Sequence, residues 1–406
     1  MVACYADFGY YPREEDRYWE TPFTDYTYED YSPEKALQAA DIHARSYLLA
    51  DTIPPLFDVS YLVEPVEGLW LLAIDANVYF PQPSPGQPKE MQFSGTESRY
   101  NRIFENKTHL LPWITHVREE AHKHNKTLIT FSHYPLTDFN KNTSTEIKEL
   151  FRETAFDSHR LPAEKITRTF AEIGIRIHFA GHMHVNDTET YLNEDGTGLV
   201  NIQVPSLATY IPGYKILTLK NQELAEVETV TIEEVPGFNS LFPLYEKEYQ
   251  YRLQTDPAHI WDKEILQTSN YKDFCTLHFK ELVRLRFIPQ DLPSIAKDSL
   301  LEVSGKDLYT KMAQTGPVDP FSAWTGFDLI HDLYRLKYGD QQVIKQIGEK
   351  QLNEYQALFE VSGKNPQSSE VASFLSGLAV IFHKLMDGVT PEPVRIDLKN
   401  GKILPR

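Results

Sequence analysis

Apolar and polar positions along residues 58–232 alternate in the way typical of a layered α/β protein, with helices packed on sheets. Helical periods flank the predicted strands at 33–49, 110–124 and 162–172. Six short apolar runs predict strands at 69–75, 127–132, 175–180, 199–204, 214–219 and 227–232. The first three runs are almost continuously apolar, as in strands covered on both faces. The last three tend to alternate, which predicts antiparallel neighbours.

The opening of the chain departs from this pattern. Residues 5–31 are rich in Tyr, Pro, Asp and Glu and show neither a helical nor a strand period. We therefore expect 1–57 to be an irregular Tyr/Pro-rich insertion plus one helix, and not to contain the opening strand of a sheet. This segment would form the start of a domain that spans 1–232.

Another change follows the last predicted strand. The segment 233–250 contains two prolines and a glycine and predicts a linker. Within 251–406 the apolar positions recur with a helical period, which predicts an all-α C-terminal domain. One of its helices is expected to start after Ser368 or Ser369, as N-cap, and to end at Gly388.

The charge balance limits the classes of partner. The chain has 58 acidic and 40 basic residues and a formal net charge of −18, so we expect no affinity for nucleic acid or for an anionic membrane surface. No apolar stretch is long enough to predict a membrane span, and no signal-peptide pattern opens the chain, so the compartment stays open. Cys4 and Cys275 are too few for a disulfide framework.

Candidate chemistry lies at the ends of two predicted strands. Gly181-His182-Met183-His184 follows one apolar run, and Ser132-His133-Tyr134-Pro135 follows another. In an extended segment, residues two apart point the same way, so His182 and His184 can face one cavity. Imidazole nitrogens are good ligands for Zn, Mn or Fe. The conjunction of the two motifs predicts a metal site that contains His133, His182 and His184.

The order strand, Ser-His-x-Pro, helix, strand, Gly-His-x-His over residues 58–232 resembles the back half of the calcineurin-like metallophosphoesterase superfamily. The resemblance implies two packed sheets flanked by helices. It also implies that His133 and His182 bind one divalent metal ion and His184 a second. The implied reaction is hydrolysis of a small phosphate mono- or diester by a water that the two metals activate. Asn77, Tyr134 and Asn186 are weaker candidates for substrate contact.

The sequence departs from the family pattern upstream of His133. The expected Asp-x-His, Gly-Asp and Gly-Asn-His motifs are missing, and Asp41-Ile42-His43 sits inside a helical pattern. We therefore expect an incomplete, truncated sandwich that lacks its first strands, binds metal weakly and has little or no turnover.

Two alternatives remain open at this stage. An amidohydrolase also has a His-x-His at a strand end, but it needs further strand-end ligands that the helical C-terminal part does not offer. A non-catalytic, degenerate phosphoesterase-fold binding protein fits the missing motifs. In both cases the helical domain is a candidate for self-association.

Overall fold

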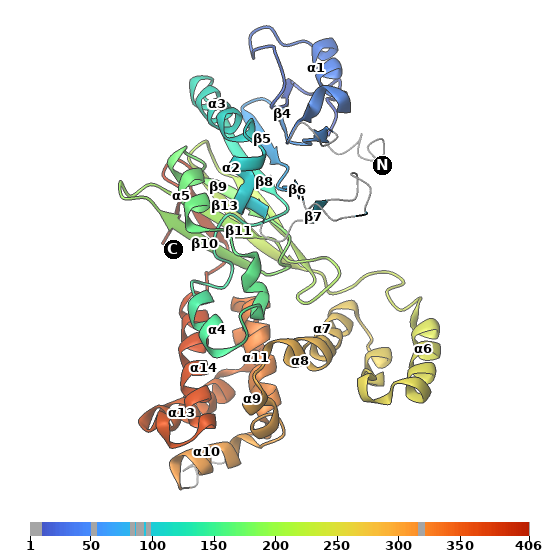
Figure 1. Cartoon of the computed structure of the whole chain (residues 1–406), viewed down its shortest axis with the longest axis vertical. Helices are drawn as coiled ribbons and strands as arrows, with labels where there is room; N and C mark the ends of the chain where they lie inside the picture. Colours follow the sequence, from blue (N-terminus) through green and yellow to red (C-terminus); the bar gives the residue numbers. More distant parts are fainter. Residues whose placement is uncertain are drawn as a thin grey trace.

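The computed structural model describes residues 10–49, 55–81, 86, 93–94, 99–315 and 321–405. Its centre is a seven-stranded sheet (Figure 1). Across the sheet the strands are β1 (Tyr18–Glu20), β4 (Tyr61–Val66), β5 (Leu69–Ile74), β8 (Thr127–Ser132), β9 (Ile177–Ala180), β11 (Gly198–Gln203) and β10 (Asp187–Leu192). The four strands β5, β8, β9 and β11 are parallel, whereas β1, β4 and β10 pair antiparallel with their neighbours.

A second sheet covers one face of the first. It contains β12 (Gly213–Leu219), β13 (Leu224–Thr231), β14 (Val394–Asp397) and β15 (Lys402–Leu404), all antiparallel. Ile129, Ile177 and Val200 of the large sheet share an apolar core with Val227 and Ile396 of the small one. The predicted layered α/β fold with two packed sheets is therefore confirmed.

Helices cover the opposite face of the large sheet. The sequence of β5 is apolar throughout because both faces of this strand are covered. Trp70 and Leu72 pack in the core beneath the helices, whereas Leu69 packs between the two sheets. Ile114 and Phe170 are among the fully buried helix residues of that core. The helices on this side are α2 (Ile103–Asn106), α3 (Leu110–Lys123) and α5 (Glu164–Glu172).

The opening segment is more ordered than its sequence predicts. Residues 18–20 form β1, which pairs with β4 and extends the sheet beyond β5, and Trp19 in this strand is fully buried. Tyr18 stacks on Trp70 with ring centroids 5.7 Å apart. The expected absence of a strand in this segment is therefore corrected. The remaining elements here are α1 (Pro33–Ala39) and the short strand pairs β2 (Ser46–Tyr47) with β3 (Leu56–Phe57) and β6 (Phe80–Pro81) with β7 (Phe93–Ser94).

The helical region packs directly on the sandwich and shares its interior. Phe151, Phe156 and Met183, which follow strands β8 and β9, lie in one core with Tyr334 and Leu378 from the helices. The helices are α4 (Ser144–Leu150), α6 (Phe242–Thr255), α7 (Tyr271–Leu282), α8 (Ile288–Asp291), α9 (Ser294–Ser299), α10 (Gly305–Ala313), α11 (Gly326–Gly339), α12 (Gln341–Ile347), α13 (Glu349–Lys364) and α14 (Glu370–Asp387). In Figure 1, α4 lies beside α14, and α6 lies at the margin of the helical region, where its Phe242 ring lies 5.5 Å from Phe274 of α7.

Two details of the C-terminal half differ from expectation. Helix α6 starts at Phe242, inside the predicted linker 233–250. The segment predicted as all-α at 251–406 ends in the strands β14 and β15, which return to the second sheet. Ser369 caps α14, and Gly388 follows its end, as predicted. No helix among the described residues has the length and hydropathy that a bilayer crossing requires.

A buried ion cluster fixes the loop after β5. The Lys107 ammonium lies 2.8 Å from Asp75 and 3.2 Å from Asp58, and His109 lies 2.9 Å from Asp58. Burial alone would raise the pKa of Asp58, but Lys107 and hydrogen bonds from His109 and Ser60 outweigh it and hold this pKa below its ordinary value. The carboxylates therefore depend on Lys107 for compensation of their charge.

A second buried cluster joins β10 to the helical region. Lys141 lies 2.8 Å from Asp340, at the end of α11, and 3.2 Å from Asp187, at the start of β10. Burial, and then the nearby Asp187, raises the pKa of Glu189 to about 9. Glu189 is therefore protonated and neutral at pH 7.

Candidate functional site

The two histidine motifs meet at one edge of the large sheet. Strands β8 and β9 are parallel neighbours, with Ser132 opposite Ala180, so the segments that follow them leave the sheet side by side. The carbonyl oxygen of His133 accepts hydrogen bonds from the backbone N–H groups of Gly181, at 3.1 Å, and His182, at 2.8 Å. These bonds hold the two loops in register beyond the strand ends.

His133 and His182 are in direct contact. Nδ1 of His182 lies 2.9 Å from Nε2 of His133, and the Tyr134 ring packs against both imidazoles, with centroids 4.3 Å from His182 and 5.1 Å from His133. Burial, and then the neighbouring His133, lowers the pKa of His182 to about 4. Burial and His184 lower the pKa of His133 as well. Both rings are therefore neutral at pH 7 and carry lone pairs.

The spacing of the pair fits two ligands of one metal ion. With metal–nitrogen bonds of about 2.0–2.1 Å, two ligands at right-angled or tetrahedral positions place their nitrogens roughly 2.9–3.4 Å apart. The observed separation of 2.9 Å lies in this range. His133 and His182 could therefore hold one cation without a large movement of either ring.

His184 does not complete a three-ligand group with this pair. It is exposed and adopts a left-handed backbone conformation, with φ of 56°. Among the described residues, the nitrogens of the three histidines do not all lie within 4.8 Å of one another. Met183 and Val185 on either side are buried in the core shared with the helical region, which turns His182 and His184 outward. Gly181 of the Gly-His-x-His motif does not adopt a positive φ, and a Cβ added to it would meet no atom within 4 Å.

Arg160 is a component of the site that the sequence did not predict. Its guanidinium Nη1 lies 2.6 Å from Nε2 of His182. A guanidinium can only donate, so Nε2 of His182 accepts, and the proton of this neutral ring must reside on Nδ1. The Nδ1–H of His182 therefore donates to Nε2 of His133. A cation between His133 and His182 would require this proton to move to Nε2, where Arg160 now donates.

A hydrogen-bonded chain supports the His133 loop from below. His178 in β9 is fully buried, and burial lowers its pKa to about 3. Its Nε2 lies 3.0 Å from the Ser132 hydroxyl, and its Nδ1 lies 3.1 Å from the Thr130 hydroxyl. The Tyr100 hydroxyl donates to Ser132 at 2.6 Å. These residues position the loop and lie beneath the sheet edge, as expected for a core histidine.

The three candidates for substrate contact lie in different environments. Tyr134 lies against both histidines. Asn77 is exposed, and its backbone N–H donates to Asp75 at 3.0 Å, which is an ordinary turn after a strand end. Asn186 is buried, and its side-chain oxygen accepts from the Thr229 hydroxyl at 2.9 Å. The side chain of Asn186 therefore ties a loop to β13, and substrate contact by this residue stays a prediction.

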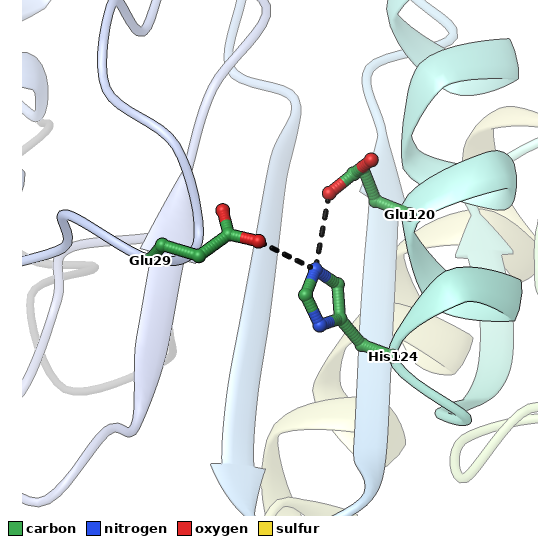
Figure 2. A group of neighbouring side chains, drawn as sticks. All are labelled: Glu29, Glu120 and His124. Carbon is green, nitrogen blue, oxygen red and sulfur yellow. Dashed lines mark hydrogen bonds and ion pairs between the residues drawn. The ribbon is translucent and has the colours of Figure 1, made fainter.

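A separate cluster of potential ligands lies between the opening segment and α3. Glu120 and His124 of α3 face Glu29 of the opening segment, and Nε2 of His124 lies 3.1 Å from Glu120 and 3.5 Å from Glu29 (Figure 2). Lys123 lies 3.0 Å from Glu120 and 3.3 Å from Glu29 and already balances their charge. We interpret the cluster as an ion-pair network that ties the opening segment to α3. The Asp41-Ile42-His43 triplet is also structural, because Asp41 caps a short turn by accepting from the His43 N–H.

Comparisons with known proteins add little to this geometry. No protein-family model matches the sequence, and no curated protein matches it. One solved structure to which the chain is weakly similar is a dimetal phosphatase from Danio rerio, with a TM-score of 0.26 and 12% sequence identity. The alignment covers 43% of this chain and spans 58% of the length of that one. A likeness of this strength carries no argument about function, so the site residues must support any assignment by themselves.

Proposed function

We propose that this chain is a metal-dependent phosphoesterase domain with a partial set of ligands. In this proposal, His133 and His182 hold one divalent cation, and His184 contributes to a second position. The observation that carries the proposal is the 2.9 Å separation of two neutral imidazole nitrogens at the ends of adjacent parallel strands. The Gly-His-x-His and Ser-His-x-Pro motifs that supply these nitrogens resemble those of metallophosphoesterases.

The chain's own residues would bind and orient the substrate. Divalent cations, when bound, would polarise the phosphoryl oxygens and lower the pKa of an attacking water. The neutral imidazoles would ligate without adding negative charge that repels phosphate. Tyr134 would exclude water from one side of the pair, and the permanently charged Arg160 would attract phosphoryl oxygens.

The partial ligand set favours weak binding of metal and slow turnover by this polypeptide. Two nitrogens at one position leave most of the coordination sphere to water, and the hydrogen bond from Arg160 competes for His182. That same hydrogen bond favours a second candidate function, a non-catalytic phosphoesterase-fold protein that binds anions. In that case His182 serves to orient Arg160 and needs no metal.

Metal titration separates the two functions. Metal-depleted protein is titrated calorimetrically with Mn²⁺ and with Zn²⁺, and the His133→Asn and His182→Asn variants are compared with His116→Asn, an exposed histidine on α3. We expect binding that both site variants lose and the control keeps. Hydrolysis of an aryl phosphate monoester and a diester should follow metal occupancy. Binding that is absent from the wild type, or unchanged in both site variants, would refute the metal-dependent function.

A further inference from the structure

Arg160 also borders a cavity of about 370 Å³ between the sandwich and the helical region. Its walls come from the turn Ala155–Arg160, from the segment that follows α4, and from α8 and α11. A π-helical turn, Val283–Phe287, supplies a further wall. The cavity is therefore built jointly by the loop beside the histidine pair and by helices far away in sequence.

Positive charge is concentrated around this cavity. Three arginines, Arg152, Arg160 and Arg286, line it together with His159, although the whole chain has a net charge of −18. Two carboxylates also line it, and both are engaged. Asp157 lies 3.6 Å from Arg160, and Asp291 accepts a hydrogen bond from the Tyr334 hydroxyl at 2.7 Å.

Two of the arginines retain unused binding capacity. Within the described ranges, neither Arg152 nor Arg286 forms an ion pair with a carboxylate. Arg286 lies over the ring of Phe287, with its guanidinium carbon 5.8 Å from the ring centroid. A guanidinium presents a planar fork of donors that matches the oxygens of a phosphate or carboxylate. The cavity therefore offers guanidinium donors for an anion.

The position of the third arginine links the cavity to the histidines. Arg160 contacts His182 at 2.6 Å and lines the cavity with the same side chain. Only the Arg160 guanidinium would therefore separate an anionic group in the cavity from the His133–His182 pair. A ligand that reaches both places needs two anionic groups separated by only a few bonds.

We propose that this cavity is an anion subsite that receives a second phosphate or carboxylate group of a phosphorylated substrate. The identity of the first group, a phosphoryl group at the histidines, rests on the proposed function. The anion subsite itself depends only on the three arginines. It also gives the helical region a role, because Arg286 and residues of α8 and α11 line the cavity.

Binding of inorganic pyrophosphate and inorganic phosphate to the metal-depleted full chain tests the proposal. We expect calorimetry to show pyrophosphate binding at least fivefold more tightly than phosphate. The variants Arg152→Gln and Arg286→Gln should each weaken pyrophosphate binding at least fivefold. The control Arg168→Gln removes the same charge from an exposed position on α5 and should change it less than twofold. Arg152 and Arg286 are both exposed, so both variants are expected to fold.

The outcomes separate this proposal from the proposed function. Equal affinities for pyrophosphate and phosphate, or wild-type affinity in the Arg152→Gln variant, would overturn the anion subsite. The His133→Asn variant should lose metal binding but keep pyrophosphate binding, because it leaves Arg160 and the cavity intact. A wild type that binds pyrophosphate through the arginines but never binds metal would support the anion subsite while refuting the metal-dependent function.

Discussion

Replacement of Arg160 by alanine should strengthen metal binding, which is an unusual direction for a mutation in a functional site. In the metal-free protein, Arg160 donates to Nε2 of His182 at 2.6 Å and so keeps the ring proton on Nδ1, between the two imidazoles. A cation bound by His182 and His133 must displace that proton. The wild type therefore has to break the Arg160 hydrogen bond before His182 can ligate.

The size of the effect follows from this bond. A hydrogen bond to a charged group contributes about 1.5–3 kcal/mol when buried. The Arg160 side chain is 35% exposed, so we discount its contribution to about 1 kcal/mol for solvent screening. Loss of this bond should tighten binding of Mn²⁺ or Zn²⁺ about fivefold. Repulsion between the guanidinium and a divalent cation acts in the same direction, so fivefold is the least we expect.

Two measurements check this reasoning independently. Calorimetric titration compares wild type, Arg160→Ala and the exposed control Arg168→Ala, which should resemble the wild type. Nitrogen-15 NMR of the histidine rings in metal-free protein should show His182 protonated on Nδ1 in the wild type and shifted towards the Nε2-protonated form in Arg160→Ala. If the tautomer shifts but the metal affinity does not rise, the competition between arginine and metal is refuted.

Other perturbations have effects of defined sign. Lys107→Met should destabilise the fold by about 3–5 kcal/mol in denaturant unfolding, because it leaves two buried carboxylates uncompensated; a loss below about 1 kcal/mol would contradict this. Glu189 keeps its proton up to a pKa of about 9 when folded but loses it near 4.5 when unfolded, so stability should fall as pH rises between these values. Glu189→Gln should abolish that slope and be more stable at pH 8 by about 1–2 kcal/mol; an unchanged slope would exclude a protonated Glu189. Gly326→Ala should destabilise the fold by about 1–3 kcal/mol, because the added Cβ would lie 2.1 Å from a backbone carbonyl oxygen. The control Gly181→Ala should change the stability by less than about 0.5 kcal/mol, because a Cβ there meets no atom within 4 Å. Equal effects of the two substitutions would contradict the packing argument.

The sequence predicted the strands with continuous or alternating apolar runs and missed those with polar or interrupted sequences. The six apolar runs correspond to β5, β8, β9, β11, β12 and β13. Strand β10 has the polar sequence DTETYL, because it lies at the edge of the sheet with one side unpaired. Strand β4 is interrupted by Glu64, a buried carboxylate that pairs with Lys126 at 2.7 Å. An apolar period cannot reveal strands whose stability comes from pairing and buried ion pairs.

The local sequence pattern also did not predict which strands pair when the partners are far apart in the chain. We expected the last three strands to be antiparallel neighbours, but β11 pairs parallel with β9 and belongs to the large sheet, and only β12 and β13 pair as predicted. The partner of β13 on its other side is β14, more than 160 residues later in the chain. Nothing in the local sequence of residues 394–404 specifies that partner.

Only those site residues that belong to a motif at a strand end could be predicted from the sequence. His133 and His182 were found because each immediately follows an apolar run, and parallel pairing brings them together. Arg160 carries no such signal. It reaches His182 through a turn in which Phe156 and Asp157 both adopt left-handed backbone conformations, with φ of 54° and 58°. Such conformations are rare for residues with side chains, so sequence patterns do not indicate where the turn will direct Arg160.

The return of β14 to β13 has a consequence for motion and for engineering. Because Val394 pairs opposite Val227, the helices at 242–387 are anchored to the small sheet at both their entry and their exit. An element tethered at two adjacent points cannot swing away on a single hinge, so we expect the wall formed by Arg286, Tyr334 and Tyr338 to keep its place when a ligand binds. The entry and exit strands are hydrogen-bonded neighbours, so a short connector could replace the helices altogether. That shortened protein would lose the Arg286 wall and would expose Met183 and Val185, which are buried against the helices beside His182 and His184.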